Sequence, residues 1–178
     1  MITNWRANNK ENNAMTQRKR HGILMDWFQS REQESMCDAA IAYACEQDNS
    51  VELMMRLLNE KAEQVGDCLI WNKSIDKGYG RHSIRIDLEM KVSVRVQAHR
   101  LIYALSNGFE ALPPSKRQHG QPADQLVLDH LCGNRACVQP AHFQVITMSE
   151  NASLQGQERI APPLSFGRVI ATSGELVA

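Results

Sequence analysis

The most informative stretch of the chain runs from Asp129 to Asn151 and reads Asp-His-Leu-Cys-Gly-Asn-Arg-Ala-Cys-Val-Gln-Pro-Ala-His-Phe-Gln-Val-Ile-Thr-Met-Ser-Glu-Asn. Soft and borderline metal ligands recur in it at the short spacing that lets one loop wrap a zinc ion: Cys132, Cys137 and His142. Asp129, His130 and Asn151 supply a base and oxygen donors, which suit a hard ion such as Mg²⁺. We therefore expect zinc to hold a second, working site in shape.

The residues around this loop predict a strand on each side of it and a helix after it. The apolar run 126–128 is typical of a short buried strand, and 143–146 reads as a second strand. Thr147 and Glu150 have the spacing of a capping box, so a helix is expected to begin at the residue after Thr147. Asn151 then lies one turn into that helix. The predicted unit is strand, zinc loop, strand and helix, with its two ends bringing the strand histidine and the helix asparagine together.

With these motifs identified, the stretch resembles the HNH endonucleases, within the wider His-Me finger or ββα-metal group. It is most similar to the phage-type members and to the His-Cys box homing endonucleases, which carry a zinc loop. The family pattern of Asp-His, two Cys, Pro-x-His, Thr and Asn is present, with Gln139 where an Asn usually precedes the Pro. The resemblance implies that His130 is a general base and that Asn151 and Asp129 bind a catalytic divalent ion. It also implies cleavage of DNA to 5′ phosphate and 3′ hydroxyl ends.

The zinc loop needs a fourth ligand, because structural zinc is almost always four-coordinate. Cys68 is the best candidate, since the fourth ligand of the His-Cys box relatives is likewise a cysteine from well upstream. A Cys₃His site would tie the segment around Cys68 to the catalytic unit. The alternative is a set of free thiols and an unrelated histidine.

Three upstream motifs extend the resemblance to zinc-bearing phage HNH proteins. They are Cys-x-x-Trp at 68–71, Gly-Tyr-Gly-Arg at 78–81 and Ala-His-Arg-x-x-Tyr at 98–103. An arginine from this region approaches the scissile phosphate in relatives, which makes Arg81 a catalytic candidate. His99 has two interpretations, a metal ligand or a hydrogen-bonded packing histidine, and the second is the commoner role.

A long alternation of apolar and polar residues predicts a β-hairpin over residues 83–98. Even positions are apolar and odd positions polar, as expected for one buried and one solvated face, with a turn near 87–90. A two-stranded ribbon fits the major groove of DNA, and the candidate DNA-binding residues are Arg81, Arg85, Lys91 and Arg95. A solvated sheet face explains the same pattern equally well.

Two amphipathic patterns precede the hairpin and predict helices over 23–47 and 51–65. They form a helical hairpin that either packs on the rest of the protein, as such stripes usually do, or contacts DNA. Cys37 and Cys45 lie on the first apolar stripe and are expected to be buried thiols rather than ligands. A further helix is predicted over 98–107, followed by an irregular loop over 109–125.

These segments predict an α+β protein in which a helical N-terminal segment precedes a β-hairpin and a zinc-stabilised ββα-metal unit. The expected organisation is a mobile basic arm (1–22), a helical region (23–66), a nuclease domain (67–156) and a loosely ordered tail (157–178). Among 178 residues, 43% are hydrophobic, which is ordinary for a soluble protein. No apolar run is long enough to span a bilayer and no signal peptide is recognisable, so a cytoplasmic location is expected.

Charge and cysteine content bear on the function classes that remain. The 20 basic and 20 acidic residues cancel, which argues mildly against a simple nucleic-acid binder, although an overall balance can hide a basic face. Five cysteines are an odd count without the spacing of a secreted disulfide scaffold. The leading hypothesis is a DNA endonuclease with structural Zn²⁺ and catalytic Mg²⁺. The alternatives are a non-cleaving DNA-binding or packaging accessory and a zinc-stabilised interaction module.

Overall fold

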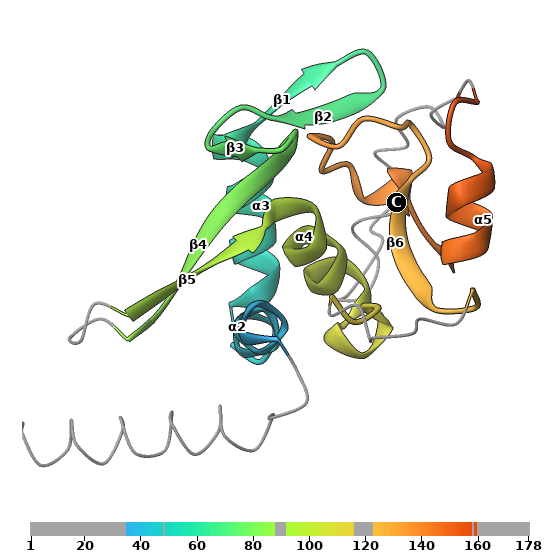
Figure 1. Ribbon diagram of the computed structural model, residues 1–178. Helices are drawn as coiled ribbons and strands as arrows, with labels where there is room; N and C mark the ends of the chain where they lie inside the picture. Colours follow the sequence, from blue (N-terminus) through green and yellow to red (C-terminus); the bar gives the residue numbers. More distant parts are fainter. Residues whose placement is uncertain (1–34, 48, 88–91, 116–122, 158, 160–178) are drawn as a thin grey trace, which may run out of the picture.

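The computed structural model describes residues 35–47, 49–87, 92–115, 123–157 and 159. The described residues form helices and three small antiparallel sheets (Figure 1), which confirms the α+β class. The elements in chain order are α2 (Met36–Cys45), α3 (Ser50–Lys61), β1 (Ala62–Val65), β2 (Cys68–Trp71), β3 (Ile75–Asp76), β4 (Tyr79–Asp87), β5 (Val92–Gln97), α4 (Ala98–Asn107), β6 (Leu126–His130), β7 (Phe143–Thr147) and α5 (Met148–Ser153), with 3-10 turns at Phe109–Ala111 and Pro140–His142.

Helix α4 is the central element of the molecule. It lies between the β4–β5 ribbon with its covering helices α2 and α3 on one side and the β6–β7–α5 unit on the other (Figure 1). Large side chains from each of these parts are almost completely buried in one core: Ile41, Leu57, Trp71, Val96, Leu101, Ile102 and Val138. The apolar stripes of α2 and α3 are therefore used for packing, the commoner of the two predicted roles. None of the described helices combines the length and apolar character that a bilayer span requires.

The two N-terminal helices are shorter than the sequence predicted. Ser35 has an extended backbone and its hydroxyl accepts a hydrogen bond from the Asp38 amide at 3.1 Å, so a helix begins here and does not run unbroken from residue 23. Residues 23–34 lie outside the described part of the chain. The second helix ends at Lys61, because residues 62–65 pair with β2 around a turn at Gly66, whose φ is +58°. Pairing with the next strand in a hairpin thus overrides the helical spacing of Ala62 and Val65.

Cys37 and Cys45 are half-buried on α2. Burial raises the pKa of both thiols, and that of Cys45 reaches about 11 with the added effect of the neighbouring Glu46 carboxylate. Both side chains therefore stay neutral at physiological pH, as expected for thiols that pack rather than bind metal.

The β4–β5 ribbon forms as predicted. Pairing runs from Arg81 opposite Gln97 to Arg85 opposite Ser93, with a register shift before Asp87 opposite Val92. The even residues Ile84, Ile86 and Val96 are buried, whereas the odd residues Arg85 and Arg95 are exposed. Val92 is 41% exposed, against the alternation, because it lies where the ribbon projects beyond α2 and α3 (Figure 1). Residues 88–91, and with them the candidate Lys91, are outside the described residues.

A buried ion pair fastens α2 to α4. Arg100 Nη2 donates to Asp38 Oδ1 at 2.8 Å and to the Pro113 carbonyl at 2.7 Å. The other oxygen of Asp38 accepts from the amide and the hydroxyl of Ser115 at 2.9 and 2.7 Å. Burial alone would raise the pKa of Asp38, but the charge of Arg100 and the bonds from Ser115 outweigh it and hold the pKa below its ordinary value. The loop after α4 is thereby anchored, a task the sequence did not reveal.

We expect Asp38→Asn to lower the free energy of unfolding at pH 7 by about 3–5 kcal/mol, because it leaves a buried guanidinium without its counter-charge. The folded pKa of Asp38 is lowered, so its stabilising effect is present above the ordinary pKa of 3.8 and fades as the pH falls below that value. Urea unfolding at pH 7 and at pH 3 measures both effects. The matched control is Asp76→Asn, which breaks the half-exposed pair with Arg81 and should cost about 0–1 kcal/mol. Equal losses in the two variants would contradict the prediction.

Candidate active site and metal centre

The β6–β7–α5 unit has the strands and the helix that the sequence predicted. Strands β6 and β7 pair antiparallel from Leu126 opposite Thr147 to His130 opposite Phe143, which leaves the zinc loop as the connection between them. The capping box is present: Thr147 Oγ1 accepts from the Glu150 amide at 3.1 Å and Glu150 Oε2 accepts from the Thr147 amide at 2.8 Å. Helix α5 therefore begins at the residue after Thr147, as predicted, and extends far enough to include Asn151.

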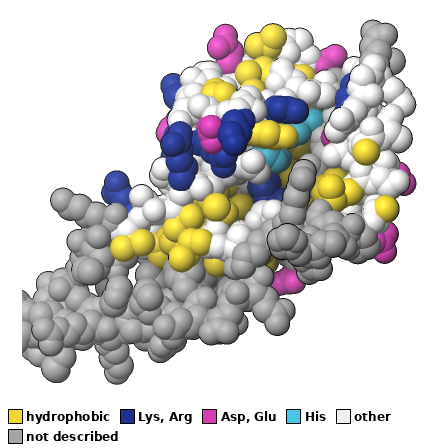
Figure 2. All heavy atoms as spheres, in the orientation of Figure 1, with side chains coloured by type: hydrophobic (Ala, Val, Ile, Leu, Met, Phe, Trp, Pro, Cys, Tyr) yellow, Lys and Arg dark blue, Asp and Glu magenta, His cyan; other side chains and the backbone are white. Residues whose placement is uncertain are grey.

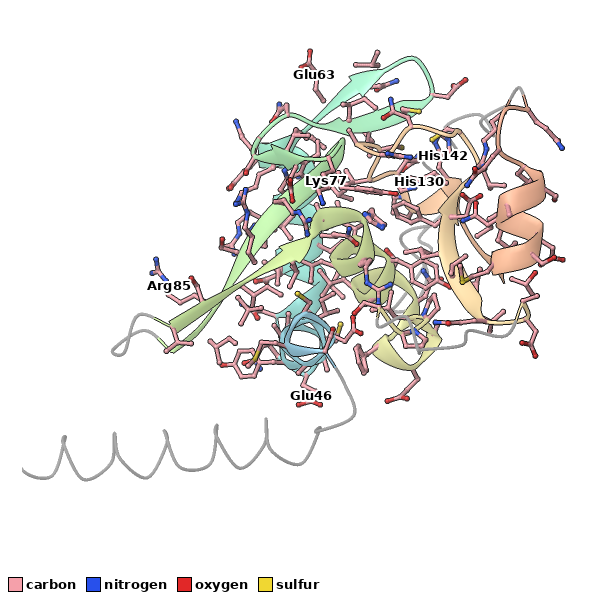
Figure 3. The ribbon with its side chains drawn as sticks, viewed as in Figure 1. Glu46, Glu63, Lys77, Arg85, His130 and His142 are labelled. Atoms are coloured by element: carbon pink, nitrogen blue, oxygen red, sulfur yellow. The ribbon has the colours of Figure 1, made fainter. Side chains whose placement is uncertain are left out.

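The four predicted zinc ligands lie together. One ligand atom from each of Cys68, Cys132, Cys137 and His142 falls within 4.8 Å of every other. His142 Nδ1 lies 3.6 Å from Cys68 Sγ and 3.5 Å from Cys137 Sγ. Tetrahedral zinc with ordinary Zn–S and Zn–N bonds separates its ligand atoms by roughly 3.5–3.8 Å. The group therefore fits an ion such as zinc, and Figure 3 shows His142 at the inner end of the loop.

Backbone hydrogen bonds bring the distant Cys68 to the loop. The Val138 amide donates to the Leu69 carbonyl at 2.7 Å, and the Trp71 amide donates to the Ala136 carbonyl at 2.9 Å. The loop thus runs alongside β2 as a short extra strand, with a bridge between residues 70 and 137. The Leu131 amide also donates to the His142 carbonyl at 2.8 Å, which closes the loop at its base.

The three thiols of the cluster differ in acidity. A hydrogen bond from Cys137 is the main cause that lowers the pKa of Cys132 to about 5. The same bond, together with burial, raises the pKa of Cys137, and burial and the nearby Cys132 raise the pKa of Cys68. One thiolate is thus stabilised by its neighbours, while two further thiolates would need a cation between them. This is the electrostatic behaviour expected of a metal-binding cysteine cluster.

A polar cavity of about 690 Å³ lies beside the cluster. Its wall includes Asp129 and His130 from the end of β6 and Asn151 from α5, so the two ends of the ββα unit meet there. Arg135 from the loop and Arg159 from beyond α5 complete the charged part of the wall. Carboxylate and amide oxygens of this kind suit a hard divalent ion. The cavity therefore gathers a histidine, two oxygen donors and two guanidinium groups at one place.

His130 is held by one hydrogen bond and by aromatic packing. Its Nε2 lies 3.2 Å from the Cys137 carbonyl oxygen, which only accepts, so the ring proton is on Nε2 and Nδ1 of the neutral ring is left to accept a proton. The ring centroid lies 4.8 Å from that of His99 and 5.3 Å from that of Phe143. Burial lowers the pKa of His130, although the nearby Cys132 and the bond to Cys137 oppose it. His130 is therefore neutral at physiological pH.

His99 packs against neighbouring rings as predicted, but no partner for its Nδ1 is found among the described residues. It is almost completely buried between Tyr79, His130 and Phe143. Burial, together with the neighbouring His130, holds the pKa of His99 well below its ordinary value. It belongs to no described cluster of three or more metal-binding side chains, and its ring packs against that of His130.

Asp129 has two partners that sequence reasoning missed. Gln144 Nε2 donates to Asp129 Oδ2 at 2.9 Å from the neighbouring strand. Arg159 Nη1 lies 2.8 Å from both carboxylate oxygens. Gln144 was detectable from the sequence, since it stands directly opposite Asp129 once β6 and β7 are paired. Arg159 follows α5 in a segment without periodicity, predicted only as tail, and carries no such signal.

Arg81 is not among the residues that line the cavity. Its guanidinium pairs instead with Asp76 at 2.7 Å. Because alternate residues share a face, Arg81, Arg85 and Arg95 lie on the same side of the β4–β5 ribbon. Figure 2 shows Lys and Arg side chains gathered on this side of the molecule, next to histidine side chains. A basic surface thus exists despite the zero net charge.

Comparison with known protein families agrees with this geometry. Residues 96–153 match the family model described as HNH endonuclease. This segment covers less than half of the chain, from α4 through α5, and contains Asp129, His130 and Asn151 together with the three loop ligands of the cluster. It supports the HNH family for this part of the protein, and with it nuclease activity on DNA as a class. Comparisons with curated proteins and with solved structures gave no match.

Proposed function

We propose that this protein is a metal-dependent DNA endonuclease of the zinc-bearing HNH type, similar to the phage-type and His-Cys box enzymes. The observation that carries the proposal is the meeting of Asp129, His130 and Asn151 on one cavity wall beside the Cys₃His cluster. A zinc module without catalysis has no need of these three side chains. The family match over the same residues supports the same function.

In the proposed reaction, His130 takes the proton from the attacking water. Water is a poor nucleophile toward a phosphodiester anion, so a positioned base accelerates the attack. The carbonyl of Cys137 fixes the proton on Nε2, and the surrounding rings hold the imidazole in place, so that Nδ1 is the basic atom. As the proton is removed, the water oxygen forms a bond to phosphorus and the bond from phosphorus to the 3′ oxygen breaks, with that oxygen taking up a proton from solvent. This chemistry leaves a 5′ phosphate and a 3′ hydroxyl.

Asp129 and Asn151 are the proposed ligands of the catalytic ion, for which Mg²⁺ is the best candidate. When bound, such an ion neutralises charge on the phosphate and on the departing oxygen. Asn151 contributes a neutral amide, which leaves the ion more positive charge to offer the substrate than a second carboxylate would. Gln144 orients the Asp129 carboxylate from the adjacent strand.

The Cys₃His cluster has a structural role in this proposal. Its ligands are all protein side chains, as in closed structural zinc sites. One of them, Cys137, also provides the carbonyl that holds His130. Zinc at the cluster would therefore fix the position of the proposed base as well as the fold of the loop.

The exposed face of the β4–β5 ribbon is the proposed contact with the DNA backbone. We expect Arg85→Gln to weaken DNA binding several-fold for all sequences and to reduce the slope of log affinity against log salt by about 1, the loss of one phosphate contact. Fluorescence anisotropy in EDTA over a salt series measures both quantities. Arg56→Gln is the control, because Arg56 is exposed on α3, near His82 on the covered face of the ribbon. If the two variants weaken binding equally, the ribbon face is not the contact.

The second candidate is a DNA-binding accessory that keeps the fold without cleaving, which the zero net charge and the additional helices allow. An end-labelled DNA duplex discriminates between the two. A nuclease should retard the duplex in EDTA and cut it when Mg²⁺ is supplied, whereas an accessory should retard it in both conditions and leave both strands intact. Ligase should reseal the nicks, because sealing requires the predicted 5′ phosphate and 3′ hydroxyl.

A further inference from the structure

Arg159 forms an ion pair with Asp129, the carboxylate that the proposed ion needs as a ligand. Its Nη1 lies 2.8 Å from each oxygen of Asp129 and donates to the His130 carbonyl at 2.7 Å. The side chains of Arg159 and Asp129 are only 17% and 10% exposed, so the pair is largely shielded from water. In this arrangement the guanidinium already neutralises the carboxylate that would otherwise attract a cation.

The contact has a matching feature in the zinc loop. Gly133 has a φ of +68°, and a Cβ at that position would lie 3.0 Å from Cδ of Arg159. The aliphatic part of Arg159 therefore passes over the loop where a side chain is missing. Glycine at this position adopts the positive φ of the turn and leaves room for the arginine side chain. Arg159 thus contacts the site at two points: its aliphatic part lies over Gly133, and its guanidinium binds the Asp129 carboxylate.

Asp129 cannot serve both cations in this geometry. Oδ2 already accepts from both Gln144 and Arg159, and Oδ1 accepts from Arg159, so the open side of the carboxylate lies next to the guanidinium. A hard divalent ion binds oxygen at about 2.0–2.1 Å, which would bring it within roughly 5 Å of the guanidinium. Like charges at that separation repel strongly in a partly buried site. Ion binding to Asp129 therefore requires Arg159 to leave the carboxylate.

We infer that Arg159 competes with the catalytic divalent ion for Asp129 and so sets the ion concentration at which the site fills. The inference rests on the proposed function, because it concerns the ion site of that function. It adds a residue beyond the family match and beyond the ββα unit. Arg159 neutralises the Asp129 carboxylate and gives up this contact when the ion binds.

Calorimetric titration of zinc-loaded protein with Mg²⁺, without DNA, tests the competition directly. Arg159→Gln is expected to bind Mg²⁺ roughly ten- to a hundredfold more tightly than the wild type, which corresponds to the charge-assisted hydrogen bonds that the ion no longer has to displace. Arg135→Gln is the matched control: it removes the same charge from the same cavity, but its guanidinium lies over the Tyr79 ring at 5.5 Å. It should change the affinity much less.

A double-mutant cycle with Asp129→Asn separates competition from a general effect of charge. If Arg159 acts through Asp129, its replacement should no longer tighten Mg²⁺ binding once the carboxylate is gone. In the wild type, the Nε–H resonance of Arg159 should shift as Mg²⁺ is added, a readout that does not depend on any variant folding. A resonance that stays unchanged while the Asn151 amide shifts would overturn the inference.

Unchanged or weaker Mg²⁺ binding by Arg159→Gln would also overturn it. If that variant instead binds DNA more weakly in EDTA with the same Mg²⁺ affinity, Arg159 contacts phosphate and does not compete with the ion. Cleavage of plasmid by the wild type, measured on the same preparation, keeps the two proposals distinct. A wild type that cleaves with Mg²⁺ retains the nuclease function whatever the result for Arg159.

Discussion

Replacing Cys137 by serine is expected to remove zinc from the protein and to unfold the ββα unit. Cys137 is completely buried, and its sulfur lies 3.5 Å from His142 Nδ1 at the centre of the cluster. Structural zinc contributes about 10–16 kcal/mol of apparent binding energy in small zinc-folded peptides at neutral pH, and this energy is folding energy. Loss of the zinc would therefore remove an energy about as large as the whole stability of an ordinary domain. Metal analysis should find about one zinc per chain in the wild type and almost none in the variant.

Cys45→Ser is the matched control for this experiment. It makes the same chemical change at a half-buried thiol on α2, in which no metal-binding cluster was found among the described residues. Zinc content should be unchanged, and far-ultraviolet circular dichroism should stay like that of the wild type. A Cys137→Ser protein that retains its zinc and its fold would contradict the assignment of Cys137 as a ligand.

Replacing His130 by alanine is expected to slow DNA cleavage by about 10²–10⁴-fold, the usual worth of a positioned general base. Zinc content and DNA affinity should remain normal, because His130 is not one of the four clustered ligands. Single-turnover cleavage at a fixed Mg²⁺ concentration measures the rate. Metal analysis of the same sample confirms that the variant contains zinc. The combination of intact zinc and lost cleavage distinguishes this variant from Cys137→Ser.

His82→Ala is the control for His130→Ala. His82 lies on β4, contacts Trp71 and Lys61, and is not among the residues that line the cavity. It should cleave DNA at a rate close to that of the wild type. Asn151→Ala should lose activity by another route, with part of the loss recovered at high Mg²⁺ if weakened ion binding is its cause. Similar rates for His130→Ala and the wild type would exclude the proposed mechanism.

Local signals in the sequence were sufficient to predict the ββα unit. The capping box, the apolar run of β6 and the Cys and His spacing each depend on residues close together in the chain. The helix start and the strand pairing are confirmed, and the four clustered side chains could hold the predicted ion. Cys68 was found because four-coordinate zinc demands a ligand that the loop itself does not supply. The chemistry of one ion therefore predicted a contact between residues far apart in the sequence.

The helical spacing failed as a guide where strand pairing decided the outcome. Residues 62–65 continue a helical pattern, yet they form a strand because β2 is available for pairing. Arg81 remains a prediction by resemblance: its guanidinium pairs with Asp76, and the arginines that line the cavity come from the zinc loop and from beyond α5. Neither Arg135 nor Arg159 has a local pattern that marks it, because contacts across the fold, with the Tyr79 ring and with the Asp129 carboxylate, leave no periodicity in the sequence.

The most direct test of the central claim is a time course of supercoiled plasmid with zinc-loaded wild-type protein, run in parallel with Mg²⁺, with EDTA, and with His130→Ala in Mg²⁺. We predict conversion to nicked or linear DNA by the wild type in Mg²⁺, no conversion in EDTA, and a rate for His130→Ala lower by at least about a hundredfold. Plasmid that the wild type binds but leaves supercoiled in Mg²⁺ would contradict the account.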